Sequence, residues 1–307
     1  MSKVYKNAAE FIGDTPIFEL SRLSAAEGCV ATVYAKLESG NLSGSVKDRA
    51  ALFMLRGALQ RGVLPPGGTV IGVTGGNGGL ALAAVSAALG LRAVVVLPDT
   101  VPETRRAHLR AYGARVYTVP GDGGMAACQE KAKALAAQLG GAWLADQFEN
   151  EDNCRAHREG TAEEILAALP RVDYFVAGVG TGGTVTGCGE RLKMQNPACR
   201  LIAVEPMASP VLSGGFAGGH TLAGIGAGFI PEILNTYVLD EVIRVRTPDA
   251  HAAAESLART EGLFCGPSSG AALWAALAVA RRPEAAGKTV VTLLPDGGER
   301  YLYEGIV

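Results

Sequence analysis

The chain has 307 residues, enough for one large or two moderate globular domains with a well-packed interior. Hydrophobic residues make up 48% of the chain and charged residues 19%, a balance that excludes an intrinsically disordered protein. The formal net charge is −2 and no basic run exceeds two arginines, so nothing indicates a nucleic-acid or anionic-membrane partner.

Patterns typical of strands and helices alternate along almost the whole chain. A strand is predicted at about 30–37, followed by a loop of small residues and then a helix that ends near Arg61. Further strands are predicted at about 69–74, 93–97, 115–119, 142–145, 173–177, 200–205, 242–246 and 289–294. Strands and helices that alternate at this spacing predict an α/β fold with largely parallel sheets.

The loop at 41–50 reads Asn-Leu-Ser-Gly-Ser-Val-Lys-Asp-Arg-Ala and leads from a strand into a helix. Lys47 is one of eight lysines, and it falls where this small-residue loop meets the helix. Burial and the positive end of the helix dipole would both lower its proton affinity, which leaves an amine suited to Schiff-base chemistry. The alternative is a solvated lysine that pairs with Asp48 or Glu38.

The first glycine-rich loop, Thr74–Gly79, follows a predicted strand and opens a helix. Successive backbone N–H groups at a helix N-terminus form an anion site, and glycines allow a ligand to approach the backbone closely. The loop is therefore predicted to bind a carboxylate or a phosphate. The alternative is a flexible turn that needs positive φ angles.

The second glycine-rich loop, Gly178–Thr184, supports two different interpretations. Its glycines at 178, 180 and 183 match the dinucleotide fingerprint, and Glu205 stands 22 positions beyond Gly183, where a ribose-binding acid belongs. This spacing would suit a nicotinamide-dependent or flavin-dependent oxidoreductase. The hydroxyls of Thr181 and Thr184, however, suit a terminal phosphate with three oxygens better than a bridging pyrophosphate.

A third loop, Cys265–Gly270, precedes a helix predicted at 271–280. Ser268 or Ser269 would be a good N-cap for that helix, and capping alone would explain both serines.

The run from Lys36 to Arg49, Lys-Leu-Glu-Ser-Gly-Asn-Leu-Ser-Gly-Ser-Val-Lys-Asp-Arg, resembles the signature of the cysteine synthase (O-acetylserine sulfhydrylase) family. This family lies within the pyridoxal-phosphate enzymes that include cystathionine β-synthase. The resemblance covers nearly the whole chain and implies pyridoxal-phosphate fold type II, like the tryptophan synthase β-chain, with two similar three-layer α/β domains. The smaller domain is expected at 38–146, and the larger at 1–37 plus 147–307. A homodimer is also expected.

The resemblance implies roles for individual residues. Lys47 is expected to hold pyridoxal 5'-phosphate as a Schiff base and then to act as general base. The cofactor-binding residues are expected to be Lys47, Asn77, Gly180, Thr181, Gly182, Gly183, Thr184 and Ser268. The substrate-binding residues are expected to be Thr74, Gly75, Gly76, Asn77, Gly78 and Gly224. A serine at 268, beside the pyridine nitrogen, would favour elimination at the β-carbon over transamination.

The implied reaction is β-replacement on an activated serine, with O-acetylserine and sulfide giving L-cysteine and acetate. The chain departs from the family at Gly75 and Gly78, where a serine and a threonine are usual, and at Ala223, where a glutamine is frequent. The loss of two hydroxyls that could donate hydrogen bonds motivates an alternative reaction. In it the amino-acid substrate is O-phosphoserine, or the nucleophile is an amine or another thiol, and the product is a nonstandard amino acid. An oxidoreductase and a non-catalytic binding module on the same fold are the alternatives from other classes.

The cysteines and histidines indicate neither a disulfide framework nor a metal centre. The six cysteines contain no Cys-x-x-Cys pair, and they share no metal-like spacing with the four histidines. The chain begins without an export signal, so reduced thiols and a cytoplasmic location are expected.

Overall fold

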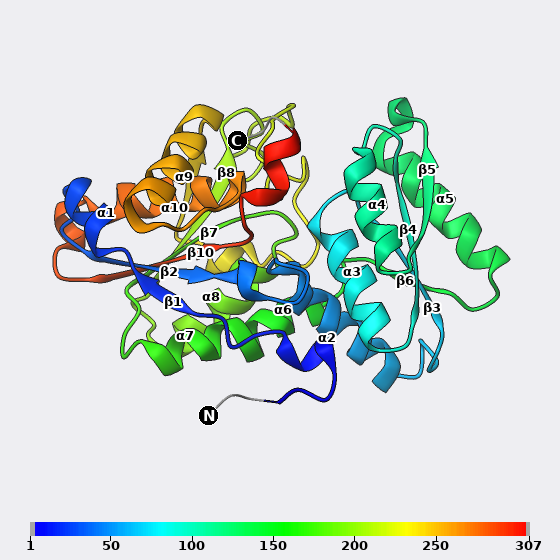
Figure 1. Cartoon of the computed structure of the whole chain (residues 1–307). Coiled ribbons are helices and arrows are strands. Elements are labelled where there is room, and N and C mark those ends of the chain that lie inside the picture. The colour runs from blue at the N-terminus through cyan, green and yellow to red at the C-terminus, as the bar shows by residue number, and fades with distance from the viewer. Residues whose placement is uncertain (1–3, 305–307) are drawn as a thin grey trace. The chain divides into compact units, whose positions relative to one another are not determined.

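The computed structural model describes residues 4–304, and the chain divides into two compact units (Figure 1). Unit 1 holds the described residues up to Gly13 together with Asn41–Asn153. Unit 2 holds Asp14–Gly40 and the described residues from Cys154 onward. Residues 4–13 and 147–153, expected in the larger domain, cluster with unit 1, and residues 38–40, expected in the smaller domain, cluster with unit 2. The domain boundaries stay a prediction.

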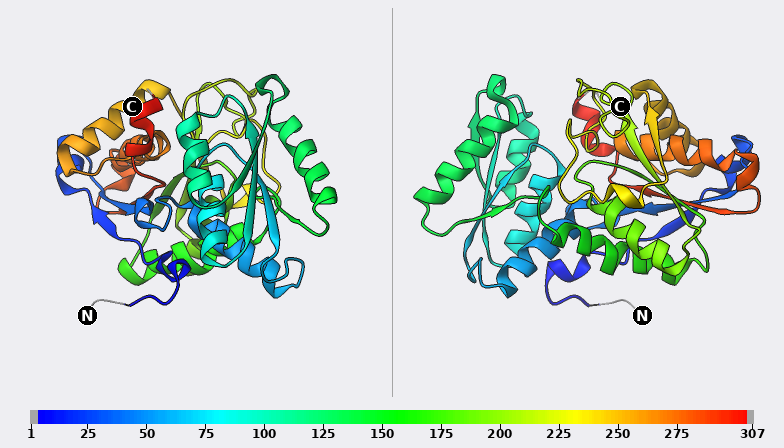
Figure 2. Two further views of the ribbon diagram at one scale, coloured as in Figure 1. Left: turned by 45° about the vertical axis from the view of Figure 1, so that its right-hand side comes forward. Right: turned by 180° about the vertical axis from the view of Figure 1, so that it is seen from behind.

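Unit 1 is built on a parallel sheet with the strand order β5-β4-β3-β6. Its strands are β3 (Thr69–Val73), β4 (Arg92–Pro98), β5 (Arg115–Val119) and β6 (Trp143–Ala145). Its main helices are α2 (Lys47–Gln60), α3 (Asn77–Ala88), α4 (Glu103–Ala111) and α5 (Gly124–Gln138), with the short 3-10 helices η1 (Ala8–Phe11) and η3 (Gly121–Gly123). The views in Figures 1 and 2 show α5 on one face of this sheet and α3 on the other.

Alternate residues of the strands in unit 1 supply two separate cores. Val70, Val95 and Leu97 pack with the apolar side chains of α2 and α3, such as Leu55 and Leu80. The neighbouring strand residues, Ile71, Val94 and Val96, pack with α5 instead. Because both faces are covered, the strands read as continuous apolar runs, as in other parallel sheets.

Unit 2 is built on a larger sheet with the strand order β1-β2-β10-β7-β8-β9. Its strands are β1 (Ile17–Glu19), β2 (Thr32–Leu37), β7 (Tyr174–Gly178), β8 (Arg200–Pro206), β9 (Glu241–Val245) and β10 (Thr289–Leu294). All neighbouring strands run parallel except the edge strand β1, which pairs antiparallel with β2.

Helices again cover both faces of the sheet in unit 2. They are α1 (Ser21–Ala26), α7 (Ala162–Ala168), α8 (Gly183–Gln195), α9 (Thr247–Glu261) and α10 (Pro267–Ala280), with the short helices η2 (Glu38–Gly40), η5 (Thr236–Val238), η6 (Pro283–Ala285) and η7 (Glu299–Glu304). The chain passes from unit 1 to unit 2 within α6 (Asp152–Ala156), which continues into a turn of π-helix, η4 (His157–Thr161). Val176 and Ile202 pack with α9 and α10, while Phe175 and Leu201 pack with α7 and α8.

The α/β prediction is confirmed, and all the strands predicted from residue 69 onward are present with their ends shifted by at most one residue. The strand β1 was not predicted from the sequence, because its three residues are too few to show alternation. Among residues 4–304, no helix combines the length and the apolar character that crossing a membrane requires.

Candidate active site

Lys47 is the first residue of α2, directly after the small-residue loop. The loop is fastened by Asp48, whose carboxylate accepts hydrogen bonds from the backbone N–H of Ser43 at 2.7 Å and from the Ser43 hydroxyl at 2.5 Å. Lys47 is half-buried, and burial lowers its pKa from 10.5 to about 8. A solvated lysine held by a carboxylate would show neither feature. The geometry thus favours an amine that gives up its proton near neutral pH.

Lys36, the other lysine of the same sequence run, lies in β2 of unit 2 and has a different environment. Its side chain is fully buried, with the ammonium 2.7 Å from the Glu164 carboxylate and 3.0 Å from the carbonyl oxygen of Thr15, to which it donates. These two contacts fix the side chain in place, so Lys36 is a structural lysine. Glu164 of α7 is half-buried, and its carboxylate pairs with this fully buried lysine.

The first glycine-rich loop connects β3 to α3 in unit 1. The N-cap of α3 is Gly76, so no side chain at the cap position covers the first N–H groups of the helix. The Thr74 hydroxyl accepts a hydrogen bond from the Gly76 backbone N–H at 3.3 Å, which folds the loop back on itself. These features are those of an anion site at a helix N-terminus.

The two unusual glycines of this loop are crowded by neighbouring side chains. A Cβ on Gly75 would lie 2.8 Å from Cγ2 of Val101. A Cβ on Gly78 would lie 2.9 Å from Oε1 of Gln147 and 3.3 Å from Oγ1 of Thr74. Polar atoms of other residues therefore surround position 78, where the family usually has a threonine hydroxyl.

Arg105 of α4 also reaches this loop, and the sequence gave no sign of it. Its Nη1 donates to the carbonyl oxygen of Gly75 at 3.3 Å, and it lies 3.7 Å from the position a Cβ on Gly76 would take. A guanidinium beside a helix N-terminus adds positive charge to the anion site. Only the fold brings Arg105 here, because it stands 30 positions along the chain from Gly75.

The second glycine-rich loop connects β7 to α8 in unit 2, and its glycines are required by close neighbours. A Cβ on Gly180 would collide with the carbonyl oxygen of Gly224. Gly182 has a φ of +90°, and a Cβ there would lie 2.9 Å from Cβ of Leu234. Gly183 begins α8, so the N–H groups of the loop meet the N-terminus of that helix.

Ser268 and Gly224 lie close together in unit 2. A Cβ on Gly224, whose φ is +97°, would lie 3.5 Å from the Ser268 hydroxyl oxygen. Ser268 is buried in the first turn of α10. The N-cap is Gly266, so the prediction that Ser268 or Ser269 caps this helix is wrong. Because Gly224 also meets Gly180, three predicted site residues from three separate loops converge.

Two residues near these loops have structural explanations. The carboxylate of Glu205 is buried and accepts hydrogen bonds from the backbone N–H groups of Leu212 at 2.8 Å and Ser213 at 3.1 Å, and from the Ser213 hydroxyl. It is thus committed to its own loop, which removes the ribose-binding acid that an oxidoreductase would need. Burial raises the pKa of Cys265 to about 12, so its thiol is not a nucleophile at neutral pH.

His157 contacts the second glycine-rich loop, although the sequence assigned it no role. Its Nε2 lies 3.2 Å from the Thr184 hydroxyl oxygen and its Nδ1 lies 2.9 Å from that of Thr161. It stands 27 positions from Thr184, and no motif in the sequence connects the two.

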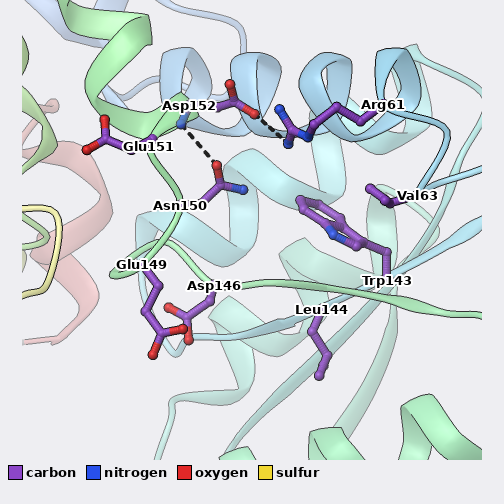
Figure 3. Close-up of a pocket in the computed structure, with 9 residues that line it drawn as sticks. All are labelled: Arg61, Val63, Trp143, Leu144, Asp146, Glu149, Asn150, Glu151 and Asp152. Atoms are coloured by element: carbon purple, nitrogen blue, oxygen red, sulfur yellow. Dashed lines mark hydrogen bonds and ion pairs between the residues drawn. The ribbon is translucent and has the colours of Figure 1, made fainter.

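A cavity of about 350 Å³ lies elsewhere in unit 1 (Figure 3). It is lined by Arg61, Val63, Trp143, Leu144, Asp146, Glu149, Asn150, Glu151 and Asp152, none of which is a predicted site residue. Arg61 and Asp152 form an ion pair of 2.8 Å above the Trp143 ring. Trp143 is half-buried and forms part of this wall.

The chemical groups present fit pyridoxal phosphate. The aldehyde needs an amine with an appreciable neutral fraction near neutral pH, and burial lowers the pKa of Lys47 to about 8. The phosphate needs backbone N–H groups that side chains do not cover, and the loop before α8 has glycine at 180, 182 and 183; a Cβ on Gly180 or Gly182 would collide with Gly224 or Leu234. The buried Ser268 offers a hydroxyl for a ring nitrogen.

Comparison with known proteins agrees with this chemistry. The sequence profile of the family described as "Pyridoxal-phosphate dependent enzyme" matches residues 8–296. The chain belongs to the pyridoxal-phosphate dependent enzymes and, within them, to the cysteine synthase family. A protein of Bacillus subtilis strain 168 named "Probable cysteine synthase" is 47% identical over 308 aligned residues, which cover 98% of this chain and 97% of the relative.

Solved structures extend the comparison. The crystal structure of a cysteine synthase from Entamoeba histolytica is similar with a TM-score of 0.95 and 39% identity, covering 99% of this chain and 91% of that one. An O-ureido-L-serine synthase is similar with a TM-score of 0.93 and 40% identity, covering 98% of this chain and 94% of that one. The cofactor of the present chain is pyridoxal phosphate, as in its family.

Proposed function

We propose that the enzyme catalyses β-replacement on O-acetyl-L-serine, with sulfide as nucleophile, giving L-cysteine and acetate. In this reaction the bond from the β-carbon to the acetate oxygen breaks, acetate leaves with the electron pair, and sulfur bonds to the same carbon. The observation that carries the proposal is the amine of Lys47, half-buried at the start of α2 with a pKa lowered to about 8. The full-length similarity to cysteine synthases supports the choice of substrates.

Lys47 is assigned two tasks, to bind the cofactor aldehyde and to remove the α-proton of the substrate. When bound, pyridoxal phosphate supplies an electron-poor ring that stabilises negative charge at the α-carbon. At pH 7.4 an amine with a pKa of about 8 is neutral in about one molecule in five, against about one in a thousand for an amine with a pKa of 10.5. Burial of Lys47 therefore raises the concentration of the reactive base about 250-fold.

The remaining cofactor contacts are assigned to unit 2 and to Asn77. Backbone N–H groups and hydroxyls of Gly180–Thr184 would bind the phosphate at the N-terminus of α8. Ser268, buried in the first turn of α10, would pair with the pyridine nitrogen. A neutral hydroxyl does not hold that nitrogen protonated, which favours loss of the β-substituent over transamination.

The substrate carboxylate is assigned to the first glycine-rich loop and the N-terminus of α3. Thr74, Gly75, Gly76, Asn77 and Gly78 would form this site, with Gly224 in unit 2 as a further substrate contact. The family's two hydroxyls are absent at 75 and 78, but the guanidinium of Arg105 and the amide of Gln147 lie beside the loop. These groups can replace hydroxyls as partners of a carboxylate.

A second candidate reaction keeps the cofactor and changes the reactants. The departures at Gly75, Gly78 and Ala223 favour an enzyme that takes O-phosphoserine, or an amine or another thiol, and makes a nonstandard amino acid. The similar structure named O-ureido-L-serine synthase supports this possibility, because its name describes a serine derivative other than cysteine.

The cofactor assignment is tested with Lys47→Ala. The purified wild type should show the near-visible absorption of lysine-bound pyridoxal phosphate and release acetate from O-acetylserine when sulfide is present. The variant should lose both, whereas Lys133→Ala, which removes an exposed lysine of α5, should keep both. A Lys47→Ala protein with an unchanged spectrum and turnover would refute the assignment.

The choice between the two reactions is tested with a panel of donors and nucleophiles. O-acetylserine and O-phosphoserine are each combined with sulfide, a small thiol and a small amine, and kcat/KM is measured for each pair. The highest value for O-acetylserine with sulfide supports cysteine synthesis. A value at least tenfold higher for another pair would favour the second candidate.

We also propose a homodimer in the cytoplasm. All six cysteines are free, and five of them are buried, which suits a reducing compartment. Light scattering of the purified protein should give about twice the 31.6 kDa mass of the chain. A mass of one chain across micromolar concentrations would contradict the dimer.

A further inference from the structure

The imidazole of His157 joins two threonine hydroxyls in unit 2. The ring is buried, with Nδ1 2.9 Å from Oγ1 of Thr161 and Nε2 3.2 Å from Oγ1 of Thr184. Thr161 is also fully buried, whereas Thr184 is half-buried in the first turn of α8, at the end of the second glycine-rich loop. The line of contacts therefore runs from the interior of unit 2 to the proposed phosphate site.

The chain builds this contact with a local departure from α-helical geometry. His157–Thr161 form a turn of π-helix, closed by the hydrogen bond from the Ala162 N–H to the His157 carbonyl oxygen. The thiol of Cys188 on α8 approaches the same carbonyl oxygen at 3.8 Å. Single π-turns within helices frequently lie at functional sites, because they re-aim side chains.

A glycine on α8 lets the two helical segments come close enough for the contact. A Cβ on Gly187 would collide with the Cys154 carbonyl oxygen and would lie 2.8 Å from both the Arg158 N and the His157 Cβ. Thr184 precedes Gly187 by three positions and so lies on the same face of α8. The glycine thus brings the Thr184 hydroxyl within reach of the His157 ring.

The direction of each hydrogen bond follows from the chemistry at the two ends. A fully ionised phosphate only accepts hydrogen bonds, so a Thr184 hydroxyl that binds it must donate its hydrogen. The Thr184 oxygen is then an acceptor toward His157, which requires a hydrogen on Nε2. In a neutral ring Nδ1 carries no hydrogen and accepts from the Thr161 hydroxyl.

We propose that His157 is a positioning residue for the cofactor phosphate: held by Thr161 as the neutral Nε2–H tautomer, it turns the Thr184 hydroxyl hydrogen toward the phosphate. This inference rests on the proposed function, since it takes Gly180–Thr184 as the phosphate loop. Its effect is pre-organisation, because the hydroxyl faces the phosphate before the cofactor arrives.

The inference is tested first by the tautomer of His157. In protein labelled with ¹⁵N-histidine and loaded with pyridoxal phosphate, long-range nitrogen–proton spectra distinguish the two ring nitrogens. His157→Gln serves to assign the signals. We expect hydrogen on Nε2 and none on Nδ1. Hydrogen on Nδ1 alone, or on both nitrogens, overturns the inference.

The second test compares pyridoxal phosphate with pyridoxal, which lacks the phosphate. His157→Gln and Thr161→Val should weaken binding of pyridoxal phosphate to the apoenzyme, His157→Gln by about 10- to 100-fold. Pyridoxal affinity should stay within about twofold of the wild-type value in both. His251→Gln, in α9 of the same unit, is the control and should change neither affinity.

The outcomes separate this inference from the proposed function. Equal weakening of pyridoxal phosphate and pyridoxal by His157→Gln would reveal general structural damage and overturn the positioning role. Unchanged affinity for both ligands would overturn it as well. A wild-type protein that binds neither ligand would instead overturn the proposed function.

Discussion

Replacing Lys47 by methionine should stabilise the apoenzyme, and by an amount that depends on pH. Methionine keeps most of the length and apolar contact of the lysine stem and removes the amine. In the wild type, burial lowers the pKa of Lys47 from 10.5 to about 8, so the folded protein resists protonation of this group. Lys47→Met has no ionisable group at this position, so its folded state is not destabilised by a buried charge.

The magnitude follows from the two pKa values. The difference between 10.5 and about 8 corresponds to about 3.5 kcal/mol, at about 1.4 kcal/mol for each tenfold change in proton affinity. Because Lys47 is only half-buried, solvent screening reduces this figure to about 1–2 kcal/mol. Below pH 8 both the folded and the unfolded wild type are protonated, and the folded state bears the whole cost.

The sign of the pH dependence is fixed by which state binds more protons. Between pH 8 and 10.5 the unfolded wild type binds more protons at this site, so the free energy of unfolding of the wild type rises with pH. The advantage of Lys47→Met should therefore be constant below about pH 7 and shrink between pH 8 and 10.5.

The assay is urea unfolding of both apoenzymes, followed by circular dichroism at several pH values from 6.5 to about 10. Other titrating groups are common to both proteins and cancel in the difference. Lys133→Met, which removes an exposed lysine of α5, is the control for the loss of a surface charge. A difference between Lys47→Met and the wild type that does not change with pH, or that grows as pH rises, would refute the reasoning.

Two further predictions concern the glycine-rich loops. Gly180→Ala should weaken binding of pyridoxal phosphate to the apoenzyme by at least about tenfold, because the added methyl meets the Gly224 carbonyl oxygen. The control is Gly219→Ala, because nothing among the described residues lies within 4 Å of its added atom. Equal affinities of the two variants for pyridoxal phosphate in a titration would contradict the prediction. Gly75→Ser alone should raise the KM for O-acetylserine, since its Cβ would lie 2.8 Å from Val101. The double variant Gly75→Ser/Val101→Ala has room for the serine and should have a KM for O-acetylserine about tenfold below the wild-type value, which is the effect of one hydrogen bond to a carboxylate. An unchanged KM in the double variant would argue against this carboxylate site.

The sequence predicted those parts of the fold that depend on local patterns. Buried parallel strands such as β7 and β8 appear as apolar runs, and the loops after them begin helices, so both the strands and the glycine-rich loops could be found. β1 could not, because three residues of an antiparallel edge strand carry too little periodicity. The start of α10 was placed too late because Ser268 or Ser269 was expected to be the N-cap, whereas the helix begins at Pro267, and proline is well suited to the first helical turn.

The candidate site was predictable only where the functional residues belong to one loop. Lys47 stands out because a lysine after a small-residue loop is unusual, and the sequence predicted that burial and the helix dipole would lower its proton affinity; in the structure, burial lowers its pKa to about 8. Arg105 and His157 reach the glycine-rich loops from 30 and 27 positions away, and the fold alone brings them there. Glu205 shows the opposite failure, because correct spacing suggested a ribose-binding acid and the structure commits its carboxylate to backbone N–H groups.

The two anion sites are built with different tolerance for change, and this difference bears on specificity. In the second glycine-rich loop the neighbours of Gly180 are backbone atoms, which cannot move aside without disturbing the loop around Gly224. In the first, the neighbours of Gly75 and Gly78 are the ends of the Val101 and Gln147 side chains, which can adopt other rotamers or be substituted singly. If the two loops bind substrate and cofactor as proposed, mutation of the first loop would alter recognition of the substrate while binding of the cofactor stays intact.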